Sequence, residues 1–460
     1  MELNRRRLIA VSALTGAVPG VTTLATPAAA APLSTFGIDA TQLGVRAGGG
    51  ADQTAMLQSA IDKAAGARVP LMLGPGDYRA AGLKLPSFAQ IVGVRGATRL
   101  VLAAGPQRST PGPMLIGASG AEHITLAGLV LDGADRPLPQ HSALVHFNQC
   151  SELRISDCEI INSGRTGIRL DAVQGAVTGN TIVNSADVAL YSLDARGLTI
   201  AANTVRGAGD GGILVHRSQQ GDDGTLIIDN RVEDIRNVSG GSGQYGNAIN
   251  VFRAGNVIVR GNRIARAAFS AVRGNAASNI QIANNLATDV GEVAIYSEFG
   301  FEGAVIANNT VDGASIGISV VNFNEGGRLA TVQGNLIRNL TNKRPAGTDP
   351  NDGAGIGIAV EADTAVSGNV IEGAPTAGIS VGWGAYLRDV SVTGNVVRNA
   401  HHGIAVSVSN GAGAAVISGN LISGAAKGAI VGMDFKRAVT DLERDGTRFA
   451  NLQVTGNRVR

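Results

Sequence analysis

The chain has 460 residues, with 64 glycines and only 16% charged side chains. The glycines follow no Gly-X-Y period, which excludes collagen, and a hydrophobic content of 44% argues against intrinsic disorder. The formal net charge of +2 gives no electrostatic reason to bind nucleic acid or an anionic membrane, and two cysteines are too few for a disulfide framework or a zinc site.

Residues 1–31 have the pattern of an export signal. Arg5, Arg6 and Arg7 precede a weakly apolar run that glycine and proline interrupt, and a stretch of small residues follows. This order predicts a twin-arginine signal peptide that is cleaved near Ala29–Ala31. A membrane anchor is the alternative, but the apolar run is shorter than the ~20 residues that span a bilayer. We therefore expect a periplasmic or secreted protein that uses the twin-arginine export machinery and has no transmembrane segment in its mature chain.

Residues 32–100 are expected to form the entry to a repetitive domain. Residues 52–65 place apolar side chains at helical spacing, with Asp52 as a candidate N-cap, and a strand and turn follow at 71–78. Because a solenoid exposes strand edges at both ends, we expect this helix to cover the first edge. No comparable cap is visible before Arg460, so the last coil is expected to be covered from elsewhere or to self-associate.

Residues 101–460 repeat two short phrases. The first places Asn between two apolar residues, as in Val-Thr-Gly-Asn-Thr-Ile at 177–182, and the second has the form Gly-Ile-x-Val. Cys158 occupies the Asn position of the first clear repeat. The later Asn positions are Asn180, Asn203, Asn230, Asn262, Asn285, Asn309, Asn335, Asn369, Asn395, Asn420 and Asn457.

This pattern predicts a parallel β-helix, an all-β solenoid. The two strands of each repeat are too short to be stable alone, and the repeats lack helical periodicity. Gly and Asn tolerate left-handed backbone, so a Gly–Asn pair suits a tight corner between strands. If coils stack with their strands ~4.8 Å apart, the Val and Ile columns are buried and the Asn side chains form a ladder.

The segment 36–97 resembles the entry segment of the pectate-lyase-like β-helix superfamily, through Gly-Gly-Gly-Ala-Asp at 48–52 and Gly-Pro-Gly-Asp-Tyr at 74–78. With its signal and its Asn repeats, the whole chain resembles a family of twin-arginine-translocated repeat proteins within that superfamily. The resemblance implies a single-stranded right-handed parallel β-helix but no settled activity. The superfamily includes polysaccharide lyases, hydrolases and epimerases as well as non-catalytic adhesins and coat proteins. The catalytic elements of polygalacturonases and alginate epimerases are not found in register, so no catalytic residue is carried over.

The outward positions of the second phrase differ between early and later coils. Side chains alternate along a strand, so the residue x of Gly-Ile-x-Val faces outward. Coils from 146 to 298 present His, Arg, Tyr, Asn and carboxylates there, whereas later coils present mostly Ser, Ala, Gly and Val. We interpret the earlier face as a groove for an acidic polysaccharide, walled by insertions at 217–225 and 238–245. The candidate binding residues are His146, Arg169, Asp171, Asn250, Asn275, Tyr296 and Glu298.

The same face carries candidate catalytic residues. A lyase or epimerase acting on a uronate needs a group that neutralises the carboxylate and another that moves a proton, and this reaction is preferred to hydrolysis. For hydrolysis, two aspartates at one register of adjacent coils are expected about 5 Å apart, closer to retaining than inverting geometry. These aspartates and Asp171 also offer an option for Ca²⁺. The candidates are Tyr191, His216, Arg273, Asp187 and Asp210.

Two other functions remain open. The groove could bind a glycan without catalysis, or the polar side chains could simply pair with one another across coils in a structural repeat protein of the envelope. The cysteines leave a similar choice. Cys150 and Cys158 could form a disulfide in an export compartment, but a reduced, buried pair is favoured.

Overall fold

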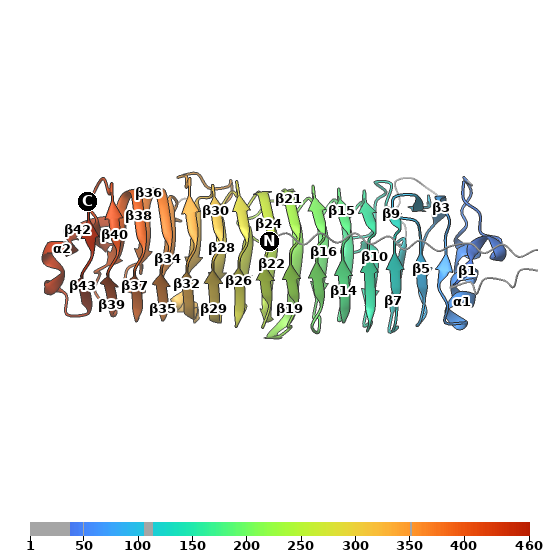
Figure 1. Ribbon diagram of the computed structural model, residues 1–460, viewed down its shortest axis with the longest axis horizontal. Coiled ribbons are helices and arrows are strands. Elements are labelled where there is room, and N and C mark those ends of the chain that lie inside the picture. Colours follow the sequence, from blue (N-terminus) through green and yellow to red (C-terminus); the bar gives the residue numbers. More distant parts are fainter. Residues whose placement is uncertain (1–36, 49, 105–113, 350–351) are drawn as a thin grey trace, which may run out of the picture. The chain divides into compact units, whose positions relative to one another are not determined.

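The computed structural model describes residues 37–48, 50–104, 114–349 and 352–460, so the expected signal peptide lies outside the described residues. Residues 37–460 form one compact unit, an elongated right-handed parallel β-helix (Figure 1). Each strand pairs in parallel with the equivalent strand of the next coil. The fold expected from the repeats is therefore confirmed.

One sheet contains sixteen strands, one from each coil. They are β1 (Ile38–Asp39), β2 (Leu71–Met72), β5 (Gln90–Val92), β8 (Thr125–Ala127), β11 (Leu153–Ser156), β14 (Gly175–Thr178), β17 (Thr199–Ala201), β20 (Leu226–Ile228), β23 (Ile258–Arg260), β26 (Ile280–Ala283), β29 (Glu302–Ala307), β32 (Arg328–Gln333), β35 (Thr364–Ser367), β37 (Val390–Thr393), β39 (Ala415–Ser418) and β43 (Leu452–Thr455).

The other sheet contains two columns of strands. The short column follows the Asn corners and consists of β3 (Gly76–Ala80), β6 (Thr98–Leu102), β9 (Val130–Asp132), β12 (Glu159–Ile161), β15 (Thr181–Val183), β18 (Thr204–Arg206), β21 (Arg231–Ile235), β24 (Arg263–Ala267), β27 (Leu286–Thr288), β30 (Thr310–Asp312), β33 (Leu336–Arg338), β40 (Leu421–Ser423) and β44 (Arg458–Val459). The strands β36 (Val370–Val381) and β38 (Val396–Ser407) run through both columns.

The long column carries the outward positions discussed above. It consists of β4 (Leu83–Lys84), β7 (Ile116–Ser119), β10 (Ala143–Asn148), β13 (Thr166–Asp171), β16 (Val188–Leu193), β19 (Gly211–Asp222), β22 (Asn247–Gly255), β25 (Val272–Asn275), β28 (Val293–Glu298), β31 (Ile316–Val320), β34 (Ile356–Val360) and β41 (Ile430–Asp434). A last strand, β42 (Arg437–Asp441), pairs with β41 in the antiparallel direction.

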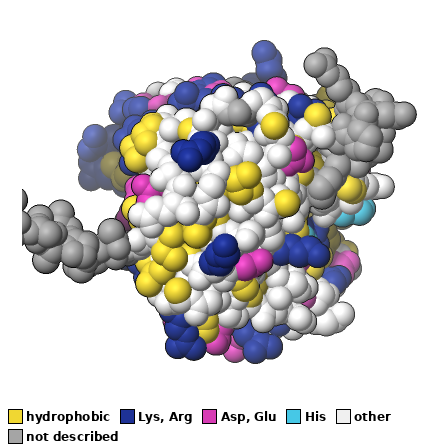
Figure 2. Space-filling model, turned by 90° about the vertical axis from the view of Figure 1, so that its right-hand side faces the viewer, with side chains coloured by type: hydrophobic (Ala, Val, Ile, Leu, Met, Phe, Trp, Pro, Cys, Tyr) yellow, Lys and Arg dark blue, Asp and Glu magenta, His cyan; other side chains and the backbone are white. Residues whose placement is uncertain are grey.

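The expected helix covers the amino-terminal coil. Helix α1 (Thr54–Gly66) packs its buried face, which includes Leu57 and Ile61, against the first coil. Its N-cap residue is Gln53 rather than Asp52, but the Asp52 carboxylate still accepts a hydrogen bond from the Thr54 amide at 2.8 Å. Figure 2 looks onto this end, where charged side chains lie among apolar ones. The coil edge is therefore covered as expected.

The carboxyl-terminal end also has a cover, which agrees with the expectation that the last coil is covered by other residues and shows that a cap is present where none was visible in the sequence. The hairpin of β41 and β42 is followed by helix α2 (Leu442–Asp445), which lies at the far end of the coil in Figure 1. Leu442 is buried in the hydrophobic core, and Phe449 packs against the core from the next turn. The signal was missed because a four-residue helix is too short to show periodicity. Three further short helical turns, η1 (Ala40–Leu43), η2 (Phe323–Glu325) and η3 (Gly446–Arg448), lie in connections.

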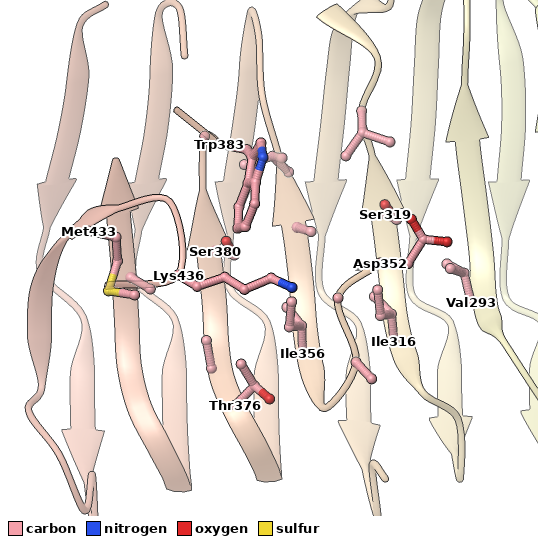
Figure 3. A pocket seen from close by; sticks show the side chains of 18 of the residues that line it. Val293, Ile316, Ser319, Asp352, Ile356, Thr376, Ser380, Trp383, Met433 and Lys436 are labelled. Carbon is pink, nitrogen blue, oxygen red and sulfur yellow. The ribbon is translucent and has the colours of Figure 1, made fainter. Parts of the chain in front are cut away.

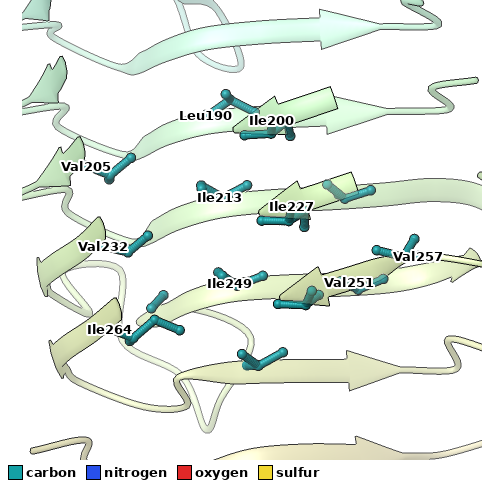
Figure 4. Close-up of a cluster of buried hydrophobic side chains, with 14 of the residues drawn as sticks. Leu190, Ile200, Val205, Ile213, Ile227, Val232, Ile249, Val251, Val257 and Ile264 are labelled. Atoms are coloured by element: carbon teal, nitrogen blue, oxygen red, sulfur yellow. The ribbon is translucent and has the colours of Figure 1, made fainter. Parts of the chain in front are cut away.

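The core is a set of aligned aliphatic columns. Figure 4 shows Ile200, Ile227, Val205 and Val232 pointing inward from adjacent coils. All four are fully buried, and the same holds for the equivalent residues of most other coils. Because side chains alternate along a strand, this inward set fixes which neighbouring residues face outward. Cys150 and Cys158 are both buried and free, and neither forms a disulfide.

The asparagine ladder is formed at every expected position. The Asn230 amide donates to Oδ1 of Asn262 at 2.9 Å, and Nδ2 of Asn262 donates to Oδ1 of Asn285 at 3.0 Å and to the Ile227 carbonyl at 2.9 Å. The same pattern continues to Asn457 at 2.9–3.0 Å. The Cys158 amide donates to Asn180 at 2.9 Å, so the ladder starts there.

We expect Asn262→Ala to destabilise the protein by about 3 kcal/mol, because it leaves the buried Asn230 amide without its acceptor and removes the bonds that Nδ2 donates to the Ile227 carbonyl and to Asn285. Denaturant unfolding followed by circular dichroism would measure the change. The matched control is Asn324→Ala, whose side chain is exposed and makes one long contact to Glu325 at 3.4 Å. Equal effects of the two substitutions would contradict a stabilising role for the ladder.

Candidate functional site

The outward residues of the middle coils line up as the sequence indicates. His146 pairs with Arg169, Arg169 with Tyr191, and the alignment continues through the long column to Tyr296. The second outward column, from Asn148 to Glu298, is aligned in the same way. The strand register therefore places the candidate residues on one face.

The first candidates bind one another. Asp171 Oδ2 lies 2.8 Å from Nε2 of His146 and accepts a hydrogen bond from Nε of Arg169 at 2.8 Å. Burial opposes ionisation of Asp171, but the bonds from His146 and Arg169 outweigh it and hold its pKa below the ordinary value. The Arg169 guanidinium also lies 5.1 Å from the Tyr191 ring. The Oδ2 atom of Asp171 is thus paired within the protein, whereas its Oδ1 atom is buried and has no hydrogen-bond partner within the described residues.

The next coils carry a row of rings. The His216 ring lies edge-on to Tyr191 at 5.2 Å and to Phe252 at 5.4 Å. Its Nε2 atom is buried and has no hydrogen-bond partner within the described residues. Burial lowers the pKa of His216 to about 4 and raises that of Tyr191. His216 is therefore a neutral, packed ring at neutral pH rather than an exposed base.

A second buried ion pair follows. Nε of Arg273 lies 2.5 Å from Oε1 of Glu298, which also accepts a hydrogen bond from Asn275 at 2.9 Å. The guanidinium donates in addition to the Gly243 carbonyl, so the expected insertion at 238–245 folds over it. Burial, reinforced by Glu298, raises the pKa of the neighbouring Tyr296 well above its ordinary value. The cation of Arg273 is thus already neutralised.

The two aspartates considered for hydrolysis have separate partners. Asp187 lies 3.4 Å from Nη1 of Arg165, and both oxygens of Asp210 accept hydrogen bonds from Ser239, at 2.6 and 2.8 Å. The Asp210 amide donates to the Asp187 carbonyl, so the residues do lie in adjacent coils. Asp210 is buried under the insertion. Among the described residues, no group of three His, Cys, Asp or Glu side chains could hold a metal ion.

A large cavity lies away from these residues, over the later coils whose outward positions are mostly Ser, Ala, Gly and Val. A trough of about 810 Å³ opens on the long column between β28 and the β41–β42 hairpin (Figure 3). We call this trough the groove. Its floor consists of the small outward residues Ser319, Ala359, Ser380 and Ala405, which pair from strand to strand. Small side chains here make room for a ligand.

One wall of the groove comes from the connection between β33 and β34. Arg344 fixes it, because Nη2 lies 3.0 Å from Glu292 and 3.2 Å from Asp352, and Nη1 donates to the Gly353 carbonyl at 2.7 Å. The side chains of Arg344 and Glu292 are only 12% and 4% exposed. This buried pair holds the wall against the body of the coil.

The opposite end of the groove is aromatic. Trp383 is 40% exposed and meets the Phe435 ring edge-on at 5.6 Å. Phe435 belongs to the turn of the β41–β42 hairpin, which also carries Lys436. The hairpin and the Trp383 turn therefore form one lip.

Polar groups without protein partners line the groove. Nδ1 of His402 and Nε of Arg344 are buried and have no hydrogen-bond partner within the described residues. Glu361 accepts a hydrogen bond from the Phe323 amide at 2.8 Å, but burial outweighs this bond and raises its pKa. Buried polar groups normally find partners, so unpaired ones in a cavity point to a ligand or water.

Of the residues chosen from the sequence, Tyr296 lines the groove, while the other binding and catalytic candidates are not among its lining within the described residues. Two features of the sequence mark the position of the groove. The step from Ser319 to Ala359 is 40 residues, against 23 from Tyr296 to Ser319, and marks the wall insertion. The one tryptophan of the chain lies in a Gly-Trp-Gly turn, where a large exposed ring has no packing reason to be.

Comparisons with known proteins agree with the fold. A family model described as a right-handed beta-helix region matches residues 116–243, 167–337 and 220–395. Among solved structures, the bacteriophage phi29 gene product 12 N-terminal fragment has a TM-score of 0.54 at 17% identity, covering 92% of this chain and 66% of that one. The Azotobacter vinelandii mannuronan C-5 epimerase AlgE6 A-module has a TM-score of 0.43 at 14% identity, covering 92% and 99%. No curated protein matches the sequence.

These likenesses show the fold alone, and the chain spans 66% of the length of the phage fragment. None of the helices in the described residues is long and apolar enough to cross a membrane. The role of the groove therefore has to be argued from its own side chains.

We expect the free energy of unfolding to fall as the pH is lowered from about 6.5 to about 4, in part through His216. Its folded pKa lies below the ordinary value, so the unfolded chain binds more protons in this window. Histidine NMR titration would measure the pKa directly. His216→Phe, which keeps a ring against Tyr191 and Phe252, should reduce the loss; an unchanged pH profile would contradict the prediction.

Proposed function

The chain belongs to the right-handed beta-helix family, and we propose that it binds a polysaccharide in the groove over its later coils. The observation that carries this proposal is the floor of small side chains bounded by one exposed tryptophan. The cavity of about 810 Å³ falls in the size range of ligand sites. A flat, amphipathic indole offers a face to the C–H groups of a sugar ring while its N–H remains free to donate.

We propose further that the polysaccharide is acidic. The arginines of the middle coils, which suggested an acidic ligand from the sequence, give this preference less support, because Arg169 and Arg273 are bound to carboxylates of the protein. The charges around the groove support the same preference. Its acidic residues are Asp352, which is bound to Arg344, and Glu361, which accepts a hydrogen bond from the Phe323 amide and whose pKa is raised by burial. Neither forms an ion pair with Lys436, so the positive charge of Lys436 is available to an anionic ligand.

Processing of the bound chain is a second candidate function, with elimination or epimerisation placed before hydrolysis. Glu361 favours it, because a buried carboxyl group whose pKa is raised above the ordinary value is a candidate to donate a proton to a leaving oxygen. Tyr296, at the other end of the groove, also keeps its proton. Non-catalytic binding or a structural role in the envelope is the alternative.

Incubation of the protein with acidic and neutral polysaccharides would separate these functions. Binding without a change in product mass supports a binding protein, fragments short by one water support a lyase, and fragments of full hydrated mass support a hydrolase. Epimerisation would leave the mass unchanged and alter the sugar NMR spectrum. The absence of binding to every polysaccharide would contradict the proposal.

We expect Trp383→Ala to weaken polysaccharide binding about tenfold, which corresponds to the loss of one ring contact of ~1.4 kcal/mol. Isothermal titration calorimetry would measure the affinity. The matched control is Tyr245→Ala, because Tyr245 is an equally exposed aromatic residue, 39% against 40%, and does not line the groove. If both substitutions weaken binding equally, the ligand does not lie against Trp383.

We also propose that the protein is exported through the twin-arginine machinery and is periplasmic or secreted after cleavage near Ala29–Ala31. Replacement of Arg5, Arg6 and Arg7 by lysine should retain the protein in the cytoplasm, because the paired arginines are the feature that the machinery reads. Cell fractionation and amino-terminal sequencing of the exported protein would measure this. Export of the lysine variant at the normal level would contradict the proposed route.

A further inference from the structure

The β41–β42 hairpin departs from the parallel pairing of the coils. Strands β41 and β42 run antiparallel and leave Phe435 and Lys436 at the turn. The Phe435 backbone is left-handed, with φ of 51°. This turn extends from the last coils over the carboxyl-terminal end of the groove, and both of its residues line the groove.

Contacts on each side hold the hairpin in place. The Phe435 ring packs on Trp383, and the Ser409 hydroxyl donates to Oδ1 of Asp434 at 2.8 Å. The other oxygen of Asp434 accepts from Nη2 of Arg437 at 2.9 Å, and together these bonds lower the pKa of Asp434. The Asp434 carboxylate of the hairpin is therefore paired with Arg437 and not with Lys436.

Lys436 makes no ion pair with any described residue within 4.0 Å. Figure 3 shows its side chain extending from the hairpin over the groove, with the ammonium group on the side of Ile356. Asp352, the acidic residue of the opposite wall, is bound to Arg344. An unpaired ammonium group over a cavity is available to a ligand.

A second, independent feature of the groove is a buried polar atom that a ligand could contact. The His402 residue is 8% exposed, and its Nδ1 atom has no partner within the described residues. His402 lines the groove together with Thr376 and Ala377, and it pairs with Ala377 across the neighbouring strands. A buried imidazole nitrogen can exchange a hydrogen bond with a sugar hydroxyl.

We propose that Lys436 holds an anionic group of the bound saccharide, a carboxylate or a sulfate, while a sugar ring of the same ligand lies against Trp383. This inference rests on the proposed function and adds the residue that selects charged over neutral chains. Phe435, which precedes Lys436, packs on Trp383, so the lip presents a cation and a ring to the same groove. The hairpin is thus the specificity element of the groove.

Paired ligands test the proposal. Polygalacturonate and its carboxyl-reduced, neutral counterpart carry the same backbone, and dextran sulfate and dextran form a second pair. Wild-type protein should prefer the charged member of at least one pair, and the pair that shows the preference distinguishes a carboxylate from a sulfate. Calorimetric affinities would be compared at two salt concentrations, because an ion pair weakens as salt increases.

We expect Lys436→Met to lower the affinity for the charged chain about tenfold and to leave the neutral chain unaffected, because one charge-assisted contact is lost. Lys436→Arg should retain most of the preference. The matched control is Lys427→Met, because Lys427 is an exposed lysine of the same region that does not line the groove. Its affinities should equal those of the wild type.

The outcomes separate this inference from the proposed function. If the wild type binds no polysaccharide, the proposed function fails and this inference with it. If the wild type binds charged and neutral chains equally, the proposed preference for an acidic chain and the role of Lys436 are both overturned, while polysaccharide binding stands. If Lys436→Met weakens both members of a pair to the same extent or neither, only the role of Lys436 is overturned. Circular dichroism of each variant would confirm that the coil is intact.

Discussion

The asparagine ladder is the constraint on which the rest of the structure depends. Each rung satisfies the corner of one coil with the side chain of the next, so every corner must lie at the same place in every coil. The Val and Ile columns then fall into line by the alternation of strand side chains. Because both the corner and the core are fixed, differences between coils are confined to the outward face and to the connections.

The groove is built from the two parts of the coil that can vary, the outward side chains and the connections. Its floor differs from the rest of the long column only in the size of the outward side chains, and its walls are insertions in connections that leave the strand register unchanged. The middle coils use the same outward positions differently, for buried ion pairs such as Arg273–Glu298. The middle face therefore stabilises the coil, while the later face is left open.

The fold could be predicted from the sequence because it is periodic, and each Asn position identified the same corner. The groove could not, because its walls interrupt the period and their placement depends on long-range contacts such as Arg344 with Glu292. The pairing of Arg169 with Asp171 was within reach of sequence reasoning, since residues two apart on a strand share a face. Counting polar residues without asking which could neutralise one another directed attention to the middle coils and away from the coils over which the cavity opens.

The ladder also aligns a set of side-chain dipoles along the axis of the coil. From Asn180 to Asn420, each Nδ2 group donates one hydrogen bond to Oδ1 of the carboxyl-terminal neighbour and another to a carbonyl of the preceding coil, so each accepting Oδ1 atom faces the amino-terminal neighbour. The side-chain dipoles therefore all point the same way, and neighbouring amides polarise one another as in a hydrogen-bonded chain. Their sum places partial positive charge toward the carboxyl-terminal coils, the half of the molecule in which the groove lies.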